Sequence, residues 1–297
     1  MKKWTRNYIL TVQVDEDAKE YVNITYPLTL SFQIKRSINA TANTASITVL
    51  NLSESTRRKV FLDNYKFMYY KGIELRAGYG DSIENMPLIF KGNIQSAFSK
   101  RNGVDYETSM EALDGGFAYV NATSNRQFPK GTTDRQALKQ LISDLKTDIN
   151  DPKKGFHIDI GHIGNFNSVL TRGNTVSGST LDLINTFSEN NFFIDLEKMN
   201  CLLDNEGFYG NIKVIDADCG LLGSPLREEA FLTFEMIFEP RLQIGQFVEI
   251  KSQTETIYNG TYKVIGIEHS GIISDAQSGQ CKTKVSLNYI DSPVIIG

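Results

Sequence analysis

Hydrophobic and polar residues alternate along much of the first third of the chain, and this period of two is typical of strands with one buried face. Every second residue of 28–35 is apolar, and the residues between them are polar. Residues 45–50 resume the pattern after the polar stretch 36–44. The two alternating segments therefore predict an antiparallel hairpin with a long loop.

The period changes abruptly at 51–61, where the spacing predicts a short helix. Ser53 can cap this helix, and Glu54 stands in its first turn. Three basic residues follow, in the order that the helix dipole favours: Arg57, Arg58 and Lys59. Val60 and Phe61 close its apolar side. We expect one or two helical turns on the outside of the sheet.

A second hairpin is predicted at Asn102-Gly103, because this dipeptide between two alternating segments is a strong short-range hairpin signal. In 104–112 apolar or small residues alternate with acidic residues and a serine. This pattern predicts a sheet with its core on one face and solvent or a partner on the other.

The middle of the chain has a different pattern, which predicts a mixed α/β region. Four apolar residues at helical spacing follow a cap at Thr133 or Asp134, namely Leu138, Leu141, Ile142 and Leu145. A second helix is predicted within 177–191, where Ser179 and Asp182 resemble a capping box. Short strands are expected around 156–160, 191–197 and 211–217.

Strand-like alternation returns from Phe231, in 231–238 and 282–290. This last part of the chain also aligns by eye with the first. Segments 71–78, 88–98 and 105–114 correspond in order to 244–251, 257–267 and 281–291. The alignment predicts a duplicated β module that is interrupted by the helical region.

Composition narrows the function classes. The 297 residues are 40% hydrophobic and 22% charged, which is ordinary for a folded protein, and the formal charge of −4 argues against a nucleic-acid-binding protein. Cys201, Cys219 and Cys281 form no close pair, which suits a reducing compartment. No apolar run is long enough for a membrane span or a signal peptide, so we expect a soluble protein made in a cytoplasm.

Candidate metal and triad residues lack the necessary spacing. His157 and Asp159 would share one face of a strand, while His162 has the opposite parity and points away. His269 lies beside Ser270, but neighbours on a strand face opposite ways, and no nucleophile-elbow motif accompanies any serine. We therefore predict no catalytic, cofactor-binding or metal-binding residues.

A carboxylate pair for glycoside hydrolysis stays open as an alternative. Glu228-Glu229 and the acidic strand faces could supply two carboxyl groups, and only their separation in space would show whether they cooperate. A peptidoglycan or glycan hydrolase is therefore one alternative reading of the chain. A simple binding module without catalysis is another.

The first part of the chain resembles the N-terminal half of bacteriophage tail hub, or baseplate hub, proteins. The matching features are a strand ending in Asn-Leu-Ser before a short helix, an Ala-Gly-Tyr strand, and a strand that begins near Phe-x-Gly, at residues 50–53, 77–79 and 90–92. The segment 238–273 is similar to the second barrel of that family, with His269 near the end of a strand. The motifs are structural and carry over no catalytic residue. A simple tail-tube or binding module stays open as an alternative to the hub.

The resemblance implies an α+β, mostly β fold, with two tail-tube-like antiparallel β-barrel domains and a mixed α/β region between them. On this reading the first barrel domain covers 1–118, the mixed region 119–230 and the second barrel domain 231–297. The resemblance also implies a homotrimer. Two barrels in each of three chains would give a ring with pseudo-sixfold symmetry, which joins the tail tube to a trimeric spike.

The expected location is the tail tip or baseplate of a virion. The expected partners are the tail tube protein and the central spike protein, with baseplate wedge and tape-measure proteins as further candidates. DNA would pass through the channel without specific binding, and no membrane insertion is expected. The candidate subunit-interface residues are Arg57, Arg58, Lys59, Asn102 and Gly103.

Overall fold

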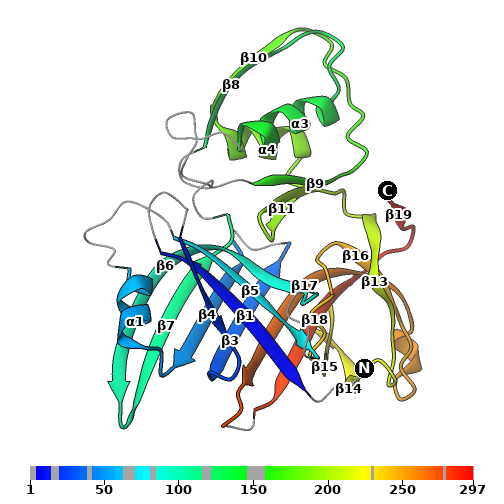
Figure 1. The fold of residues 1–297 in the computed structure, drawn as a ribbon. Coiled ribbons are helices and arrows are strands. Elements are labelled where there is room, and N and C mark those ends of the chain that lie inside the picture. The colour runs from blue at the N-terminus through cyan, green and yellow to red at the C-terminus, as the bar shows by residue number, and fades with distance from the viewer. Residues whose placement is uncertain are drawn as a thin grey trace.

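The structure is a computed structural model that describes residues 5–14, 20–38, 42–62, 71–80, 85–115, 122–145, 158–228, 231–276 and 279–296. It confirms an α+β fold that is mostly β. One long sheet curves through the lower part of the molecule, and a smaller group of helices and strands lies above it (Figure 1). None of the described helices is long and apolar enough to cross a membrane.

The first half of the long sheet is antiparallel throughout. Its strands are β1 (Arg6–Gln13), β2 (Tyr21–Thr25), β3 (Leu30–Ser37), β4 (Thr44–Leu50), β5 (Lys71–Tyr79), β6 (Leu88–Asn102) and β7 (Asp105–Leu113), in the order β3-β4-β7-β6-β5-β1-β2. The predicted hairpin of β3 and β4 is confirmed, and buried and exposed residues alternate strictly along β3. The predicted helix is α1 (Glu54–Val60), which contacts β6.

The second half repeats this strand order. It contains β13 (Glu206–Ile215), β14 (Leu221–Glu228), β15 (Phe231–Ile237), β16 (Gln246–Ile250), the 3₁₀ turn η1 (Thr256–Tyr258), β17 (Gly260–Ile273), β18 (Cys281–Tyr289) and the short β19 (Val294–Ile295). The pairing β14-β15-β18-β17-β16 corresponds to β3-β4-β7-β6-β5. The segments that align by sequence thus occupy equivalent strands. One difference is that β13 pairs with β16 in parallel, whereas β1 pairs with β5 antiparallel.

A junction of β3 with β17 joins the two halves into one 14-stranded sheet. We expected each half to close into a barrel. The hydrogen-bonded order of the described strands instead begins at β14 and ends at β2, so neither half is closed. A physical reason is visible at the β14 edge. There the ladder shifts register, Gly223 has φ of +69° and Pro225 offers no N–H, which are features that end strand pairing.

The elements of the middle region are β8 (Thr123–Phe128), α3 (Asp134–Asp144), β9 (Asp159–Ile163), β10 (Asn174–Ser179), α4 (Thr180–Ser188), β11 (Phe192–Asp195) and β12 (Lys198–Cys201). Both predicted helices are confirmed. Thr133 caps α3 in a full capping box with Gln136, and Ser179 caps α4 by accepting from the N–H of Asp182. The strand expected at 156–160 begins at Asp159, and residues 156 and 157 lie outside the described residues.

Three apolar clusters form the core. The first lies mainly within β1 to β7, the second within β13 to β18, and the third around α3 and α4. Phe238 joins the first cluster although it follows β15, and Phe193 joins the second although it belongs to β11. The clusters therefore share residues across the regions. The division of the chain into three domains at 118 and 230 stays a prediction.

Candidate functional site

The turn between β4 and α1 shows why the Asn-Leu-Ser motif ends a strand and starts a helix. Asn51 adopts φ of +57°, a left-handed conformation that asparagine tolerates. Its Oδ1 accepts from the N–H of Tyr106 at 3.0 Å, and its Nδ2 donates to Asp105 at 2.8 Å. Leu52 is buried, and the Ser53 hydroxyl accepts from the N–H of Thr56 at 3.2 Å. The motif therefore ties α1 to the start of β7.

The other end of α1 is held by a buried lysine. Lys71 Nζ donates to the carbonyl oxygens of Lys59 and Phe61 at 2.7 and 2.9 Å, and its burial lowers its pKa. A cation suits the negative end of a helix. Sequence reasoning missed Lys71, since nothing in a strand pattern shows that one side chain turns toward a helix. Val60 is buried as expected, but Phe61 is 50% exposed, so the apolar side of α1 is narrower than predicted.

The three basic residues of α1 have different surroundings. The Arg57 guanidinium lies 3.7 Å above the ring of Tyr106, a cation–π contact. Arg58 pairs with Glu54 at 2.5 Å, and Lys59 lies 4.0 Å from Glu20. Beside them is an open groove of about 570 Å³, lined by Glu54, Arg57, Arg58, Phe61, Phe98, Ser99 and Tyr106. We call this region the α1 surface.

The hairpin of β6 and β7 completes this side of the molecule. The predicted hairpin is confirmed, but its turn is shifted by one residue, because Asn102 pairs with Asp105 and Gly103-Val104 form the loop. Gly103 has φ of +62°, and a positive φ at only the first loop position is the pattern of a type II′ turn. Asn102 Nδ2 donates to Glu107 at 2.8 Å, and Val104 at the tip is 88% exposed.

One face of the long sheet is polar across both halves. The pairing register places one row of side chains across six adjacent strands: Ser96, Glu111, Ser46, Gln33, Ser270 and Lys282. A neighbouring row crosses five strands: Thr44, Lys35, Glu268, Lys284 and Glu235. None of these residues is buried. We call these two rows the polar face.

The polar face is neutral and internally hydrogen-bonded. Its three acidic and three basic residues cancel in formal charge. Gln33 Nε2 donates to Glu268 at 2.7 Å, across the junction of the two halves, and Lys282 lies 2.7 Å from Glu235. Ser46 donates to Glu111 at 2.7 Å. The face therefore has no net charge with which to attract a polyanion.

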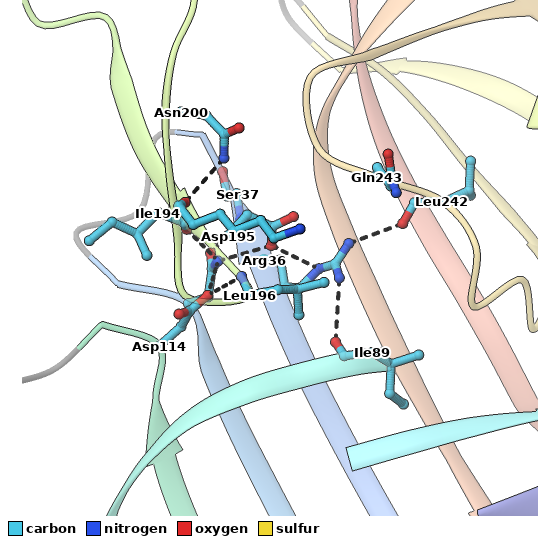
Figure 2. A network of polar contacts seen from close by, with 12 residues as sticks. Arg36, Ser37, Ile89, Asp114, Ile194, Asp195, Leu196, Asn200, Leu242 and Gln243 are labelled. Atoms are coloured by element: carbon cyan, nitrogen blue, oxygen red, sulfur yellow. Dashed lines mark hydrogen bonds and ion pairs between the residues drawn. The ribbon is translucent and has the colours of Figure 1, made fainter. Parts of the chain in front are cut away.

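A buried polar network joins the two sheet halves to the middle region (Figure 2). Arg36 of β3 is 2% exposed and donates to the carbonyl oxygens of Ile89 and Leu242 at 3.4 and 3.1 Å. Its Nε lies 3.3 Å from Asp195 of β11. Each of these partners belongs to a different part of the fold, so Arg36 links all three.

Asp114, just after β7, grips the turn between β11 and β12. Its carboxylate accepts from the N–H groups of Leu196 and Glu197 at 2.7 and 2.9 Å, and from Asn43 Nδ2 at 3.2 Å. Leu196 and Glu197 both have positive φ, 54° and 56°, which is strained for such residues. Burial, and then the nearby carboxylate of Asp195, raise the pKa of Asp114 to about 7. Sequence reasoning included Asp114 only as the last residue of the aligned segment 105–114.

The residues considered for a metal or a triad do not come together. His157 lies outside the described residues, and His162 stacks on Phe208 with ring centroids 4.1 Å apart. His269 is fully buried, with Nδ1 3.0 Å from the hydroxyl of Thr283, and burial keeps its pKa well below the usual value. Within the described part of the chain, no group of His, Cys, Asp or Glu side chains is arranged to hold a metal ion.

The carboxylates considered for hydrolysis are equally unsupported as a pair. Glu229 lies outside the described residues, as does the side chain of Glu228. A groove of about 310 Å³ beside β5 and β6 does contain two carboxylates, Glu74 and Glu197. Both contact Lys91, at 3.7 and 2.8 Å, so this groove holds an ion-pair network rather than a free acid and base.

Comparison with known proteins identifies relatives of this fold. The profile of the family described as Baseplate hub gp41 matches residues 9–275. No curated protein sequence matches the chain. Among solved structures, a tail protein from Neisseria meningitidis MC58 is similar with a TM-score of 0.57 at 10% identity, covering 95% of this chain and 96% of that one.

Two further structures share the fold. The 43 kDa tail protein of prophage MuSo2 from Shewanella oneidensis has a TM-score of 0.57 at 10% identity, covering 98% of this chain and all of the other. A chain of the lidded Francisella PdpA-VgrG complex has a TM-score of 0.54 at 10% identity, covering 99% of this chain and 54% of that one. At such low identity these likenesses concern the fold alone.

Proposed function

The chain belongs to the phage Baseplate hub gp41 family, and from this premise we propose that three copies form a ring between the tail tube and the central spike. The observation that carries the proposal is the repeated strand order within one sheet. Three chains with two equivalent halves each would present six similar surfaces to a sixfold tube, while the ring keeps threefold symmetry toward a trimeric spike.

The polar face supports a channel-lining role. Its two rows cross both halves without interruption, since β3 pairs directly with β17. A lining without net charge would let DNA pass without holding it, because strong phosphate binding needs an excess of basic side chains. In the ring, the open sheets of neighbouring chains would lie side by side around the channel. This reading also keeps the three-part division at 118 and 230 and the location at the tail tip or baseplate.

The partners follow from the same geometry. One rim of the ring would meet the tail tube protein and the other the central spike, with wedge and tape-measure proteins as further candidates. The similarity to a chain of a PdpA-VgrG complex supports a place in an assembly of several proteins. The α1 surface and the hairpin tip at Asn102 and Gly103 are the proposed contacts between subunits. No catalytic role is part of the proposal.

The test is the mass of the purified protein by light scattering, with class averages of the particles by electron microscopy. A trimeric ring with six lobes around an open channel is the expected result. Isolated chains at every concentration, both alone and with the co-expressed tube and spike proteins, would refute the ring. Release of sugars from peptidoglycan by the purified protein would instead favour the hydrolase alternative.

A further inference from the structure

Charge is unevenly distributed along the chain. Residues 1–118 contain 15 basic and 13 acidic residues, a formal charge of +2, whereas 119–297 contain 16 basic and 22 acidic residues, a formal charge of −6. Because like charges repel, this asymmetry favours contacts in which the first part of one copy meets the second part of another. The α1 surface carries part of this asymmetry, because its three basic residues exceed the two carboxylates beside them, Glu54 and Glu20.

The α1 surface has the chemistry of an unfilled docking site. Arg57 makes no ion pair within the described part of the chain, and its guanidinium is already placed by Tyr106. Phe61 and Phe98 are 50% and 47% exposed beside it. Aromatic side chains and arginine are the residues enriched at protein interfaces. The surface therefore fits a partner that brings carboxylates together with an apolar side chain.

A complementary region lies in the second half of the chain. A groove of about 630 Å³ there is lined by Asp216, Glu249, Ile250, Lys251, Ser252, Gln253, Asn259 and Gly260. Lys251 Nζ lies 3.3 Å from Glu249 and neutralises that carboxylate. Asp216 accepts from the N–H of Cys219 at 2.8 Å, which lowers its pKa and keeps it ionised.

The rim of this groove adds charge and apolar area. Asp218 and Glu255 are exposed, and Ile257 of η1 is 81% exposed. A hydrogen bond of 2.8 Å between the hydroxyls of Ser224 and Thr254 ties this loop to β14. We call the groove and its rim the β13–β16 surface. It carries four carboxylates and one lysine, the opposite charge to the α1 surface.

We propose that the α1 surface of one copy binds the β13–β16 surface of the next copy, in a head-to-tail contact that closes the ring. The two surfaces lie on opposite sides of the molecule, with α1 at one side and β13 at the other (Figure 1). A contact between two different surfaces generates a ring when its rotation closes. The inference rests on the proposed trimer and adds which surfaces meet.

Alternative contacts are less favourable. Two α1 surfaces facing each other would place arginine against arginine. Direct strand pairing at β14 is hindered by its bulge and by Pro225, which are devices that protect sheet edges. The head-to-tail contact instead sets Arg57 and Arg58 against ionised carboxylates and covers the exposed aromatic rings on one side and Ile257 on the other.

The test uses charge reversals at exposed positions. R58E/K59E on the α1 surface and D218K/E255K on the β13–β16 surface should each weaken self-association about tenfold or more, because each sets like charges against one another. Mixing the two variants, or combining all four changes in one chain, should recover most of the wild-type association. The matched control R135E/K139E reverses two exposed positive charges on α3 and should leave association unchanged.

A cysteine variant tests by cross-linking which residues of two copies lie close together, rather than how strongly the copies bind. Cys219 is in no disulfide and is partly exposed beside the acidic turn, so R58C treated with a flexible bismaleimide should link to Cys219 of another copy. R58C/C219S and K139C should not form this product. Trimers that form normally in both reversed variants, or trimers without this cross-link, would overturn the inference and leave the ring intact. Chains that stay monomeric throughout would overturn both.

Discussion

The two halves of the long sheet share a strand order but differ in the segments that connect their strands. In the first half β4 leads into α1, which Asn51 and Lys71 fasten at its two ends. In the second half β15 leads into a turn that contains Pro240, and no helix lies there within the described residues. The strand next to β5 or β16 also differs, because β1 pairs with β5 antiparallel and β13 pairs with β16 in parallel.

The strand order is common to both halves, whereas the segments that connect the strands differ. The long strands β6 and β17 both shift register against their hairpin partners near the same point, between Ile94 and Ser96 and between Val264 and Gly266. A bulge that recurs in both copies is a feature of the module itself. The connections vary more freely, and this is where surface-specific roles usually arise. We therefore expect the halves to respond differently to matched changes.

The largest effect is expected at the junction of the halves. Substituting Arg36 by alanine would leave the carboxylate of Asp195 buried without its cation and free two carbonyl oxygens. We expect R36A to lower the free energy of unfolding by about 3–5 kcal/mol, the range for breaking a buried ion pair. Urea titration followed by far-ultraviolet circular dichroism measures it.

Two controls separate the junction from a general loss of charge. K100A removes the partner of Glu107 on an exposed part of β6 and should cost less than about 1 kcal/mol. R36L/D195L replaces both charges and should be more stable than R36A, since no carboxylate then stays unpaired. An R36A protein as stable as K100A would contradict a structural role for the network.

The next largest effect concerns two glycines, one in each half, that differ in how closely neighbouring atoms approach them. A Cβ added at Gly92 of β6 would lie 2.4 Å from the carbonyl oxygen of Leu113, whereas one at Gly266 of β17 would lie 3.3 Å from the Cβ of Ser286. G92A should therefore destabilise the fold by about 3 kcal/mol, and G266A by about 1 kcal/mol or less. Thermal unfolding of both variants checks this; equal losses would contradict it.

Protons should act on the two halves with opposite sign. Asp114 has a pKa of about 7 in the folded protein and a much lower one when unfolded, so the folded state binds the proton more tightly. The stability contributed by this proton is fully present below about pH 4, near the pKa of an unfolded Asp, and is lost as pH rises from there to 7, at up to about 1.4 kcal/mol per pH unit. D114N should remove that loss in urea titrations between pH 4 and 8.

His269 of the second half provides the opposite case. Its folded pKa lies well below 6.5, so stability is present above that pH and is lost as pH falls through it. H269Q should reduce the loss of stability as pH falls below 6.5, whereas D114N should increase it, because the two groups act with opposite sign over an overlapping pH range. If both substitutions changed the dependence of stability on pH in the same direction, the assignment of the two groups would be wrong.

The smallest effect concerns α1, which only the first half possesses. S53A removes the hydroxyl that accepts from the N–H of Thr56 and should cost about 1 kcal/mol, as for other helix caps. T133A removes the corresponding cap of α3 and should cost a similar amount. The two should differ in self-association, where S53A weakens the trimer and T133A does not. If S53A and T133A self-associated equally strongly, α1 would have no role in assembly.

The elements that sequence predicts best are those with a local cause. The alternation of β3, the caps of α1 and α3, and the hairpin at Asn102-Gly103 each depend on neighbours within a few residues. The equivalence of β5 to β7 with β16 to β18 was also visible, because the same alternation recurs in both segments. Such signals fix elements and their local pairing.

Features that depend on distant parts of the chain could not be predicted in this way. Arg36 occupies a position that reads as one more polar residue of a strand, yet it contacts Asp195 and Leu242 from other parts of the fold. Closed barrels were expected, but the sheet stays open because β14 carries a bulge and Pro225. At the α1 surface the basic residues were found by sequence, while the rings of Phe98 and Tyr106 beside them were not.

The direct pairing of β3 with β17 also has a mechanical consequence. Eight consecutive residue pairs join these antiparallel strands, and their hydrogen bonds run perpendicular to the strands. A pull along the strand direction loads all these bonds at once in shear, so they share the force. A pull perpendicular to the strands, applied at one end of the pair, instead loads the hydrogen bonds one after another. The molecule is thus stiff along its strands and can be peeled apart across them.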